Sequence, residues 1–100
     1  MIVSDNPKSK GLTFGEIYNI RKNVFNFKKQ TIAEKEILQK LKKNQINLIC
    51  LAGFMKILSK NFILKFQGNI LNIHPSLLPK YKGLKTHERA INNKDKYSGC

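Results

Sequence analysis

Apolar and polar positions along the chain alternate between runs typical of strands and stripes typical of helices. Residues 46–52 are apolar on both faces apart from Asn47, which predicts a central parallel strand covered by helices on each side. A second strand is expected at 69–73, and shorter extended segments are expected at 1–4 and 23–27. These strands are separated by helix-like segments with short connections, an order typical of parallel strands joined by crossover helices.

The clearest helix signal begins at Thr31. The segment Thr31-Ile32-Ala33-Glu34 has the form of a capping box, in which the hydroxyl and the carboxylate satisfy backbone donors reciprocally. The helix that follows is expected to bury a stripe of four apolar residues. These are Ala33, Ile37, Leu38 and Leu41.

Three further helices are expected. Residues 12–19 predict a short helix, and Ser59 is expected to cap another, which ends at Gly68 in a left-handed conformation. Phe62, Ile63 and Phe66 would share one face of that helix, and 86–93 predicts the last helix. The sequence therefore predicts an α/β fold with an open, mostly parallel, Rossmann-like sheet and flanking helices.

The carboxyl ends of the two main strands are the expected ligand site, because open α/β sheets bind ligands there. Residues 53–58 follow the first strand and residues 74–85 follow the second. The chain begins inside a strand and stops where another strand is expected. We therefore expect it to be part of a larger domain with sheet edges left open.

A large positive charge sets the chain's surface apart. Lys and Arg total 19 against six acids, which gives a net charge of +13. Lysines are spread along the chain, and Lys, Asn and Ile, all residues with A/T-rich codons, are abundant. We interpret the charge as a solvated basic surface produced by compositional drift, with attraction of phosphate-bearing ligands as the alternative. No recognition-helix signature or basic stripe with interleaved aromatics favours nucleic acid as a partner.

The two cysteines and the apolar runs indicate the protein's setting. Cys50 lies in an apolar run without CxxC spacing and is expected to be a buried, reduced thiol. No apolar stretch approaches the ~18 residues of a membrane span, and the first residues do not form a signal peptide. We expect a cytoplasmic protein without a membrane partner.

Asn72 and His74 are the candidate chemistry at the end of the second strand. Because strand side chains alternate, the two would face the same way, while Leu71 and Ile73 would point into packing. A lone Asn or His at a strand end is more often a loop-capping group than a catalyst. The surrounding motif decides between these interpretations.

That motif strongly resembles the phosphoribosylglycinamide formyltransferases over nearly the whole chain. The matching segments are Leu-Ala-Gly-Phe-Met-Lys-Ile-Leu at 51–58 and Asn-Ile-His-Pro-Ser-Leu-Leu-Pro at 72–79. Pro75 and the Gly-Leu-Lys-Thr-His element at 83–87 favour this family over two relatives with the same Asn-x-His core. Those alternatives are methionyl-tRNA formyltransferases and formyltetrahydrofolate deformylases.

The resemblance implies transfer of a formyl group from 10-formyltetrahydrofolate to the amine of glycinamide ribonucleotide, in purine (IMP) biosynthesis, without a metal. His74 would be the proton donor or relay, and Asn72 would contact the oxyanion and the formyl-folate. Both roles suit the chemistry, since amine attack on a formyl carbon builds an oxyanion that an amide and a protonated imidazole stabilise. The folate would also bind along Met55, Lys56, Ile57 and Leu58. Without the resemblance, the apolar Met55, Ile57 and Leu58 would be interpreted as plain core.

The resemblance also implies that residues 1–100 are a partial formyltransferase domain. It would lack the N-terminal phosphate-binding strand-turn-helix and the C-terminal part, which carries an aspartate that holds the catalytic histidine. A catalytically inactive fragment is the alternative, and the oligomeric state is left open. Gln30, beside Lys28 and Lys29, falls where the family often has a basic residue that meets the folate tail. His87 is interpreted as a packing or capping residue, and Lys80, Lys82 and Lys85 as solvated charges.

Overall fold

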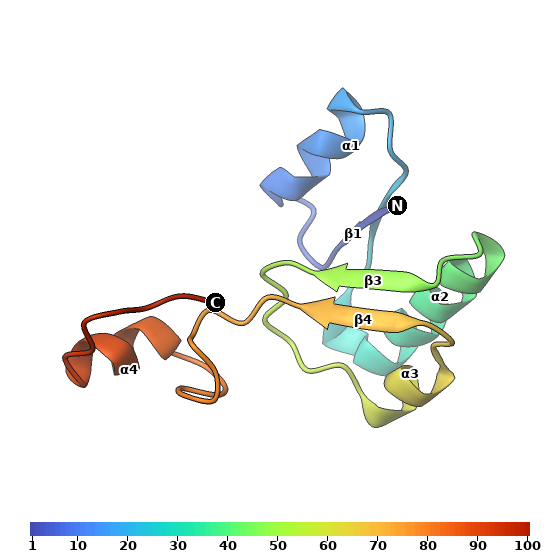
Figure 1. Cartoon of the computed structure of the whole chain (residues 1–100). Helices are drawn as coiled ribbons and strands as arrows, with labels where there is room; N and C mark the ends of the chain where they lie inside the picture. The colour runs from blue at the N-terminus through green and yellow to red at the C-terminus, as the bar shows by residue number, and fades with distance from the viewer. The chain divides into compact units, whose positions relative to one another are not determined.

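The computed structural model describes all residues from Met1 to Cys100 (Figure 1). These residues form two compact units. The first unit comprises residues 1–47 and 58–67, and the second comprises residues 48–57 and 68–100. Each unit contains one pair of parallel strands, accompanied by several helices in the first unit and by one helix in the second. The predicted α/β class with parallel strands is therefore confirmed.

The strand pair of the first unit joins β1 (Ile2–Ser4) to β2 (Lys22–Val24). The crossover between them contains the 3-10 helix η1 (Lys10–Leu12) and helix α1 (Thr13–Ile17). Phe25, expected within the extended segment 23–27, follows the end of β2, although its N–H still donates to the Ser4 carbonyl at 3.0 Å. Its side chain is buried in the core of the unit.

Helix α2 (Gln30–Lys43) begins earlier than the sequence predicts, so the capping-box prediction is wrong. The 3-10 turn η2 (Phe27–Lys29) leads directly into it, and Asn26 caps that turn by accepting a hydrogen bond from the Lys28 N–H at 3.0 Å. Thr31 is consequently already inside α2. The Glu34 carboxylate does not cap α2 and instead accepts hydrogen bonds from the Gln30 amide and from the N–H and hydroxyl of Ser59.

The core of the first unit is built on one face of α2. The expected stripe is largely confirmed, since three of its residues are buried and Leu38 is half-buried. Aromatic and aliphatic side chains from the rest of the unit complete the core. Its buried hydrophobic residues are Leu12, Phe25, Phe27, Ala33, Ile37, Leu41, Phe62 and Phe66.

Helix α3 (Lys60–Lys65) starts as predicted, because the Ser59 hydroxyl accepts a hydrogen bond from the Phe62 N–H at 3.1 Å. Its end differs from the prediction. Phe66 adopts an extended conformation with φ −80° and ψ 113°, so the helix ends at Lys65, three residues before Gly68. Phe62 and Phe66 stack with ring centroids 6.4 Å apart, whereas Ile63 is 54% exposed and lies off that face.

The second unit contains β3 (Leu48–Leu51) and β4 (Asn69–Asn72), drawn in Figure 1 as neighbouring arrows that point the same way. They pair in parallel with Leu48 opposite Asn69 and Leu51 opposite Asn72. Both strands are shorter than the sequence predicts. Helix α4 (Thr86–Asn92) completes the unit, with Thr86 and Ala90 buried.

The prediction of a strand covered on both faces is wrong for β3. Leu48 is 48% exposed and Cys50 is exposed, so the thiol is not buried as expected. Leu71 and Ile73, expected to point into packing, are 57% and 66% exposed. The exposed Leu48 and Cys50 alternate along β3 with the half-buried Ile49 and Leu51, as expected for a strand with only one covered face.

Candidate active site

The carboxyl ends of β3 and β4 meet at one edge, because the strands are parallel and in register. The Ile73 N–H continues the ladder toward the Leu51 carbonyl oxygen at 3.5 Å. Two loops therefore leave the same edge, one beginning at Ala52 and the other at His74. This is the edge at which open α/β sheets place their ligands.

Asn72 and His74 lie at this edge, as the sequence predicts. Asn72 is the last residue of β4 and its side chain is exposed, while His74 is half-buried two residues later. The His74 Nε2 atom lies 3.1 Å from the backbone carbonyl oxygen of Tyr81. Because a carbonyl oxygen only accepts, Nε2 carries the hydrogen in this contact. The structure thus shows how the imidazole is oriented.

The loop after His74 closes on itself through three further hydrogen bonds. The Ser76 N–H donates to the His74 carbonyl at 2.8 Å, and the Lys80 N–H donates to the Leu77 carbonyl at 3.1 Å. The Ser76 hydroxyl, in a residue only 4% exposed, donates to the Lys80 carbonyl at 2.7 Å. Together with the contact between His74 and Tyr81, these hydrogen bonds hold residues 74–81 in a closed loop.

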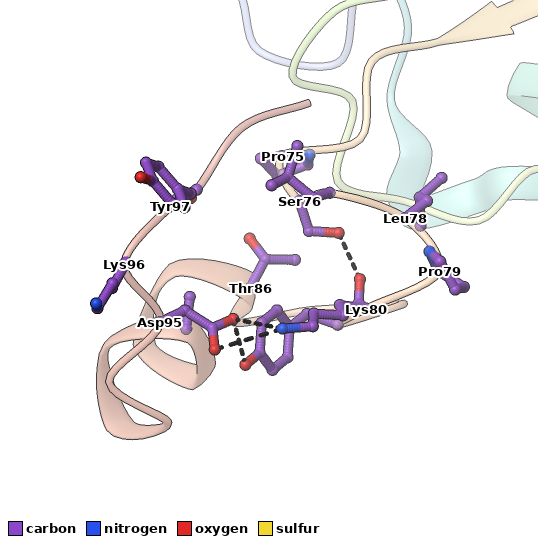
Figure 2. A pocket seen from close by; sticks show the side chains of 13 residues that line it. Pro75, Ser76, Leu78, Pro79, Lys80, Thr86, Asp95, Lys96 and Tyr97 are labelled. Carbon is purple, nitrogen blue, oxygen red and sulfur yellow. Dashed lines mark hydrogen bonds and ion pairs between the residues drawn. The ribbon is translucent and has the colours of Figure 1, made fainter.

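Asp95, which follows α4, ties this loop to the helix. Its carboxylate accepts hydrogen bonds from the Tyr81 hydroxyl at 2.8 Å and from the Asn93 amide at 2.7 Å. The Lys80 ammonium lies 3.3 Å away, and Figure 2 shows it reaching the carboxylate. The Tyr81 hydrogen bond in particular lowers the pKa of Asp95. Desolvation, followed by the Asp95 interaction, raises the pKa of Tyr81.

A cavity of about 360 Å³ lies between the loop and α4 (Figure 2). Its walls combine apolar side chains of the loop, such as Pro75 and Leu78, with Thr86, Asp95 and Tyr97. Sequence reasoning missed the roles of Ser76, Tyr81 and Asp95 here. No local motif marks them, because their contacts join positions up to 15 residues apart.

The residues expected to bind folate are mostly exposed. In the second unit, Met55 is 75% and Ile57 is 89% exposed, and Lys56 between them is also exposed. Gly53 begins this loop with a φ of +63°, a conformation that glycine adopts without steric cost. Leu58 is half-buried and belongs to the first unit. The exposed apolar side chains make this loop different from ordinary core.

Four other polar residues singled out in the sequence have defined surroundings in the structure. Gln30 is the first residue of α2, where its amide donates to Glu34 at 2.8 Å. His87 is an exposed residue of the first turn of α4. Lys80 and Lys85 are not simply solvated, because they pair with Asp95 and with Glu88, the latter at 3.2 Å.

Two general features of the chain concern metals and membranes. No group of three or more His, Cys, Asp or Glu side chains is arranged to hold a metal ion. None of the helices has the length and apolar character needed to cross a membrane.

Comparison with known proteins identifies the class. The sequence model of the Formyl transferase family matches residues 1–100, so the chain belongs to that family. The phosphoribosylglycinamide formyltransferase of Haemophilus influenzae is 42% identical over 101 residues, which cover 98% of this chain and 48% of that protein. The human trifunctional purine biosynthetic protein adenosine-3 is 38% identical over 103 residues, all of this chain and 10% of that protein.

Solved structures agree with the sequence comparisons. The phosphoribosylglycinamide formyltransferase of Brucella melitensis is similar with a TM-score of 0.86 and 41% identity, over 96% of this chain and 52% of that one. The chain therefore spans about half the length of these bacterial relatives. The resemblance seen in the sequence and the formyltransferase fold are confirmed. The named relatives favour this branch over the methionyl-tRNA and deformylase alternatives.

Proposed function

We propose that the protein transfers a formyl group from 10-formyltetrahydrofolate to the amine of glycinamide ribonucleotide. The observation that carries the proposal is the placement of Asn72 and His74. Both lie at the carboxyl edge of the β3–β4 pair, in a chain that the Formyl transferase family model matches over its whole length. The proposal places the reaction in the cytoplasm, with no metal and no nucleic acid taking part.

The two side chains suit the reaction. Attack of the amine on the formyl carbon forms a C–N bond and produces a tetrahedral oxyanion, and the attacking nitrogen must lose a proton. Collapse of this species breaks the bond between the carbon and N10 of the folate, which takes up a proton and leaves as tetrahydrofolate. Asn72 is exposed at the strand end, where its amide can donate a hydrogen bond to the oxyanion. The His74 imidazole can deliver and accept protons during formation and collapse of this species.

The loop after β3 supports a folate cosubstrate. A pteridine ring has flat faces that prefer apolar contact and an edge of hydrogen-bonding groups. Met55 and Ile57 expose apolar side chains beside the edge that carries Asn72, and such exposure is costly unless a ligand covers it. Lys56 and Leu58 complete the proposed folate segment, with backbone groups as the hydrogen-bonding partners.

The proposal includes two elements contributed by other parts of the protein. One is a phosphate-binding strand-turn-helix for the ribonucleotide, and the other is an aspartate that holds His74. Both are implied by the family resemblance, and the chain's coverage of about half of its bacterial relatives supports them. Residues 1–100 would then supply the folate side and the catalytic pair.

The test is a His74→Ala substitution in the complete natural protein, assayed with both substrates. We expect formyl transfer to fall by about 10²-fold or more, because a positioned acid–base group contributes that much. Binding of the formyl-folate should persist, measured by fluorescence or calorimetry. His87→Ala is the matched control, since His87 is an exposed histidine of the same unit and should leave turnover unchanged. Near-parental turnover of His74→Ala would disprove the assignment.

A further inference from the structure

We infer that Tyr81 and Asp95 are positioning residues that set the orientation of the His74 imidazole. This inference rests on the proposed function, because it concerns the histidine assigned to proton transfer there. Neither residue touches the reacting atoms in this account. They act through a chain of contacts that runs from the end of α4 to the imidazole.

The first link is the bond between the His74 ring and the Tyr81 backbone. The His74 Nε2–H donates to the Tyr81 carbonyl oxygen across 3.1 Å. In a neutral imidazole, one nitrogen carries the hydrogen and the other carries the lone pair. In the neutral ring, a fixed carbonyl at Nε2 therefore selects the Nε2–H tautomer and one ring orientation, and it leaves Nδ1 as the nitrogen that can take up a proton and face the aspartate that the family resemblance implies.

The second link is the backbone of Tyr81, which needs to be held in place. Its φ of 53° lies in the left-handed region, which is unfavourable for a bulky residue. Without restraint, the residue would relax and its carbonyl would move away from His74. The orientation of the His74 ring thus depends on the contacts that keep the Tyr81 backbone in this conformation.

The third link is the Tyr81 side chain, which is held at both its hydroxyl and its ring. The hydroxyl donates to Asp95 at 2.8 Å, and the Arg89 guanidinium lies 5.2 Å from the ring centroid, within cation–π range. Arg89 in turn donates to the Lys82 carbonyl at 2.7 Å. These contacts connect the left-handed residue to α4 on one side and to its own loop on the other.

The last link is Asp95, which is itself fixed. Its N–H donates to the Ala90 carbonyl at 3.1 Å, and Ala90 is a buried residue of α4. Asn93 and Lys80 donate to its carboxylate, which keeps the charged form favoured. Asp95 is therefore a rigid acceptor for the Tyr81 hydroxyl. It is separate from the aspartate that the family resemblance implies, since it reaches His74 only through Tyr81.

The test compares Tyr81→Phe and Asp95→Ala with Tyr97→Phe in the complete natural protein. Tyr97 lines the same cavity but is 80% exposed, so its change removes a matched hydroxyl outside the proposed chain. Long-range ¹H–¹⁵N correlation spectra identify the His74 tautomer without any substrate. The parent and Tyr97→Phe should show the Nε2–H form, and the other two variants should show mixed tautomers.

Steady-state kinetics supply the second measurement. We expect kcat to fall roughly 5- to 10-fold in Tyr81→Phe and Asp95→Ala, with KM for each substrate within about twofold of the parent. Asp95→Asn keeps an oxygen that can accept from the Tyr81 hydroxyl, so it should retain more of the kcat and more of the Nε2–H form than Asp95→Ala. Such rescue would not follow from a loss of folding alone.

Two outcomes would overturn the inference. One is an unchanged His74 tautomer in both Tyr81→Phe and Asp95→Ala, whatever their activity. The other is a kcat for both variants that equals that of Tyr97→Phe. An inactive parent protein would instead contradict the proposed function, and the tautomer spectra would still decide whether Tyr81 and Asp95 orient the ring.

Discussion

Different interactions stabilise the interior of each of the two units. Of the nine buried hydrophobic residues, only Ala90 lies in the second unit, whose other buried residues include Ser76 and Thr86. The first unit is a packed apolar core around α2. The second has almost no buried apolar core, and its loop after β4 is instead fixed by hydrogen bonds that converge on it.

This contrast assigns most of the folding stability to the first unit and the candidate catalytic groups to the second. Apolar burial is strong but has no direction, whereas hydrogen bonds are weaker and fix the orientation of particular groups. Asn72 and His74 lie in the unit with little apolar core, where hydrogen bonds fix the loop that follows them. Substitutions should therefore affect stability most in the first unit, and ligand binding or turnover most in the second.

The largest stability effect is expected at Phe62, which is 2% exposed and stacked on Phe66. Phe62→Ala should lower the free energy of unfolding by about 3–5 kcal/mol, because it removes a large buried side chain and leaves a cavity. Chemical denaturation measures this. Ile63→Ala, at the neighbouring exposed position, is the control and should cost far less. Equal losses at the two positions would contradict the packed-core description.

A smaller effect is expected at Glu34, the buried carboxylate of the first unit. It accepts hydrogen bonds from the N–H of Ser59 at 2.8 Å, from the Ser59 hydroxyl and from Gln30. Glu34→Ala leaves the Ser59 donors without this acceptor and should cost about 2 kcal/mol at pH 7. Glu36→Ala, an exposed residue of the same helix, should cost little by the same denaturation measurement.

The Glu34 contribution should also depend on pH. Burial would raise the pKa of Glu34, but hydrogen bonds from Ser59 and Gln30 outweigh it and leave the pKa below its usual value. A lowered folded-state pKa adds stability above the unfolded value of about 4.3, and that stability is lost as pH falls through the folded pKa. The parent and Glu34→Ala should converge in stability in acid. A difference that stays constant down to pH 2 would contradict this.

In the second unit, Ile57→Ser should affect binding instead of folding. Ile57 is 89% exposed, so the free energy of unfolding should change by less than about 0.5 kcal/mol. Loss of an apolar wall should weaken formyl-folate binding by about 1–2 kcal/mol, measured as Kd by calorimetry. An unchanged Kd would remove Ile57 from the proposed folate segment. Ile91→Ser, at a 73% exposed position in α4, is the control.

The smallest effect is expected for the ion pair between Lys85 and Glu88, which are 74% and 66% exposed. Glu88→Gln should change stability by about 0.5 kcal/mol or less, since exposed pairs are screened by solvent and salt. The difference should shrink further at high salt. A loss above about 1.5 kcal/mol would contradict this expectation. It would show that an exposed ion pair contributes substantially to the stability of the second unit.

Patterns within a few residues predicted the fold well, and contacts between distant residues were missed. The Ser59 cap and the Ala33, Ile37 and Leu41 stripe follow from local spacing. The role of Glu34 was misread, because its partner Ser59 lies 25 residues away. Cys50 was misread because burial of a strand depends on the layers that cover it.

In the candidate site, too, local patterns were predictive and contacts between distant residues were missed. Asn72 and His74 were found because a strand end and a local motif place them together. Tyr81 and Asp95 could not be found in this way, since their contacts depend on a left-handed backbone and on where α4 ends. An aspartate 21 residues after the histidine has no local signature that links it to the ring.

The exposed apolar side chains of the second unit have a calorimetric consequence. Met55 and Ile57 contact water in the loop after β3, and water ordered around apolar surface contributes to the heat capacity. A ligand that covers them should bind with a negative change in heat capacity, so that its binding enthalpy becomes more favourable as the temperature rises. The temperature dependence of the binding enthalpy would thus report directly whether this loop meets the ligand.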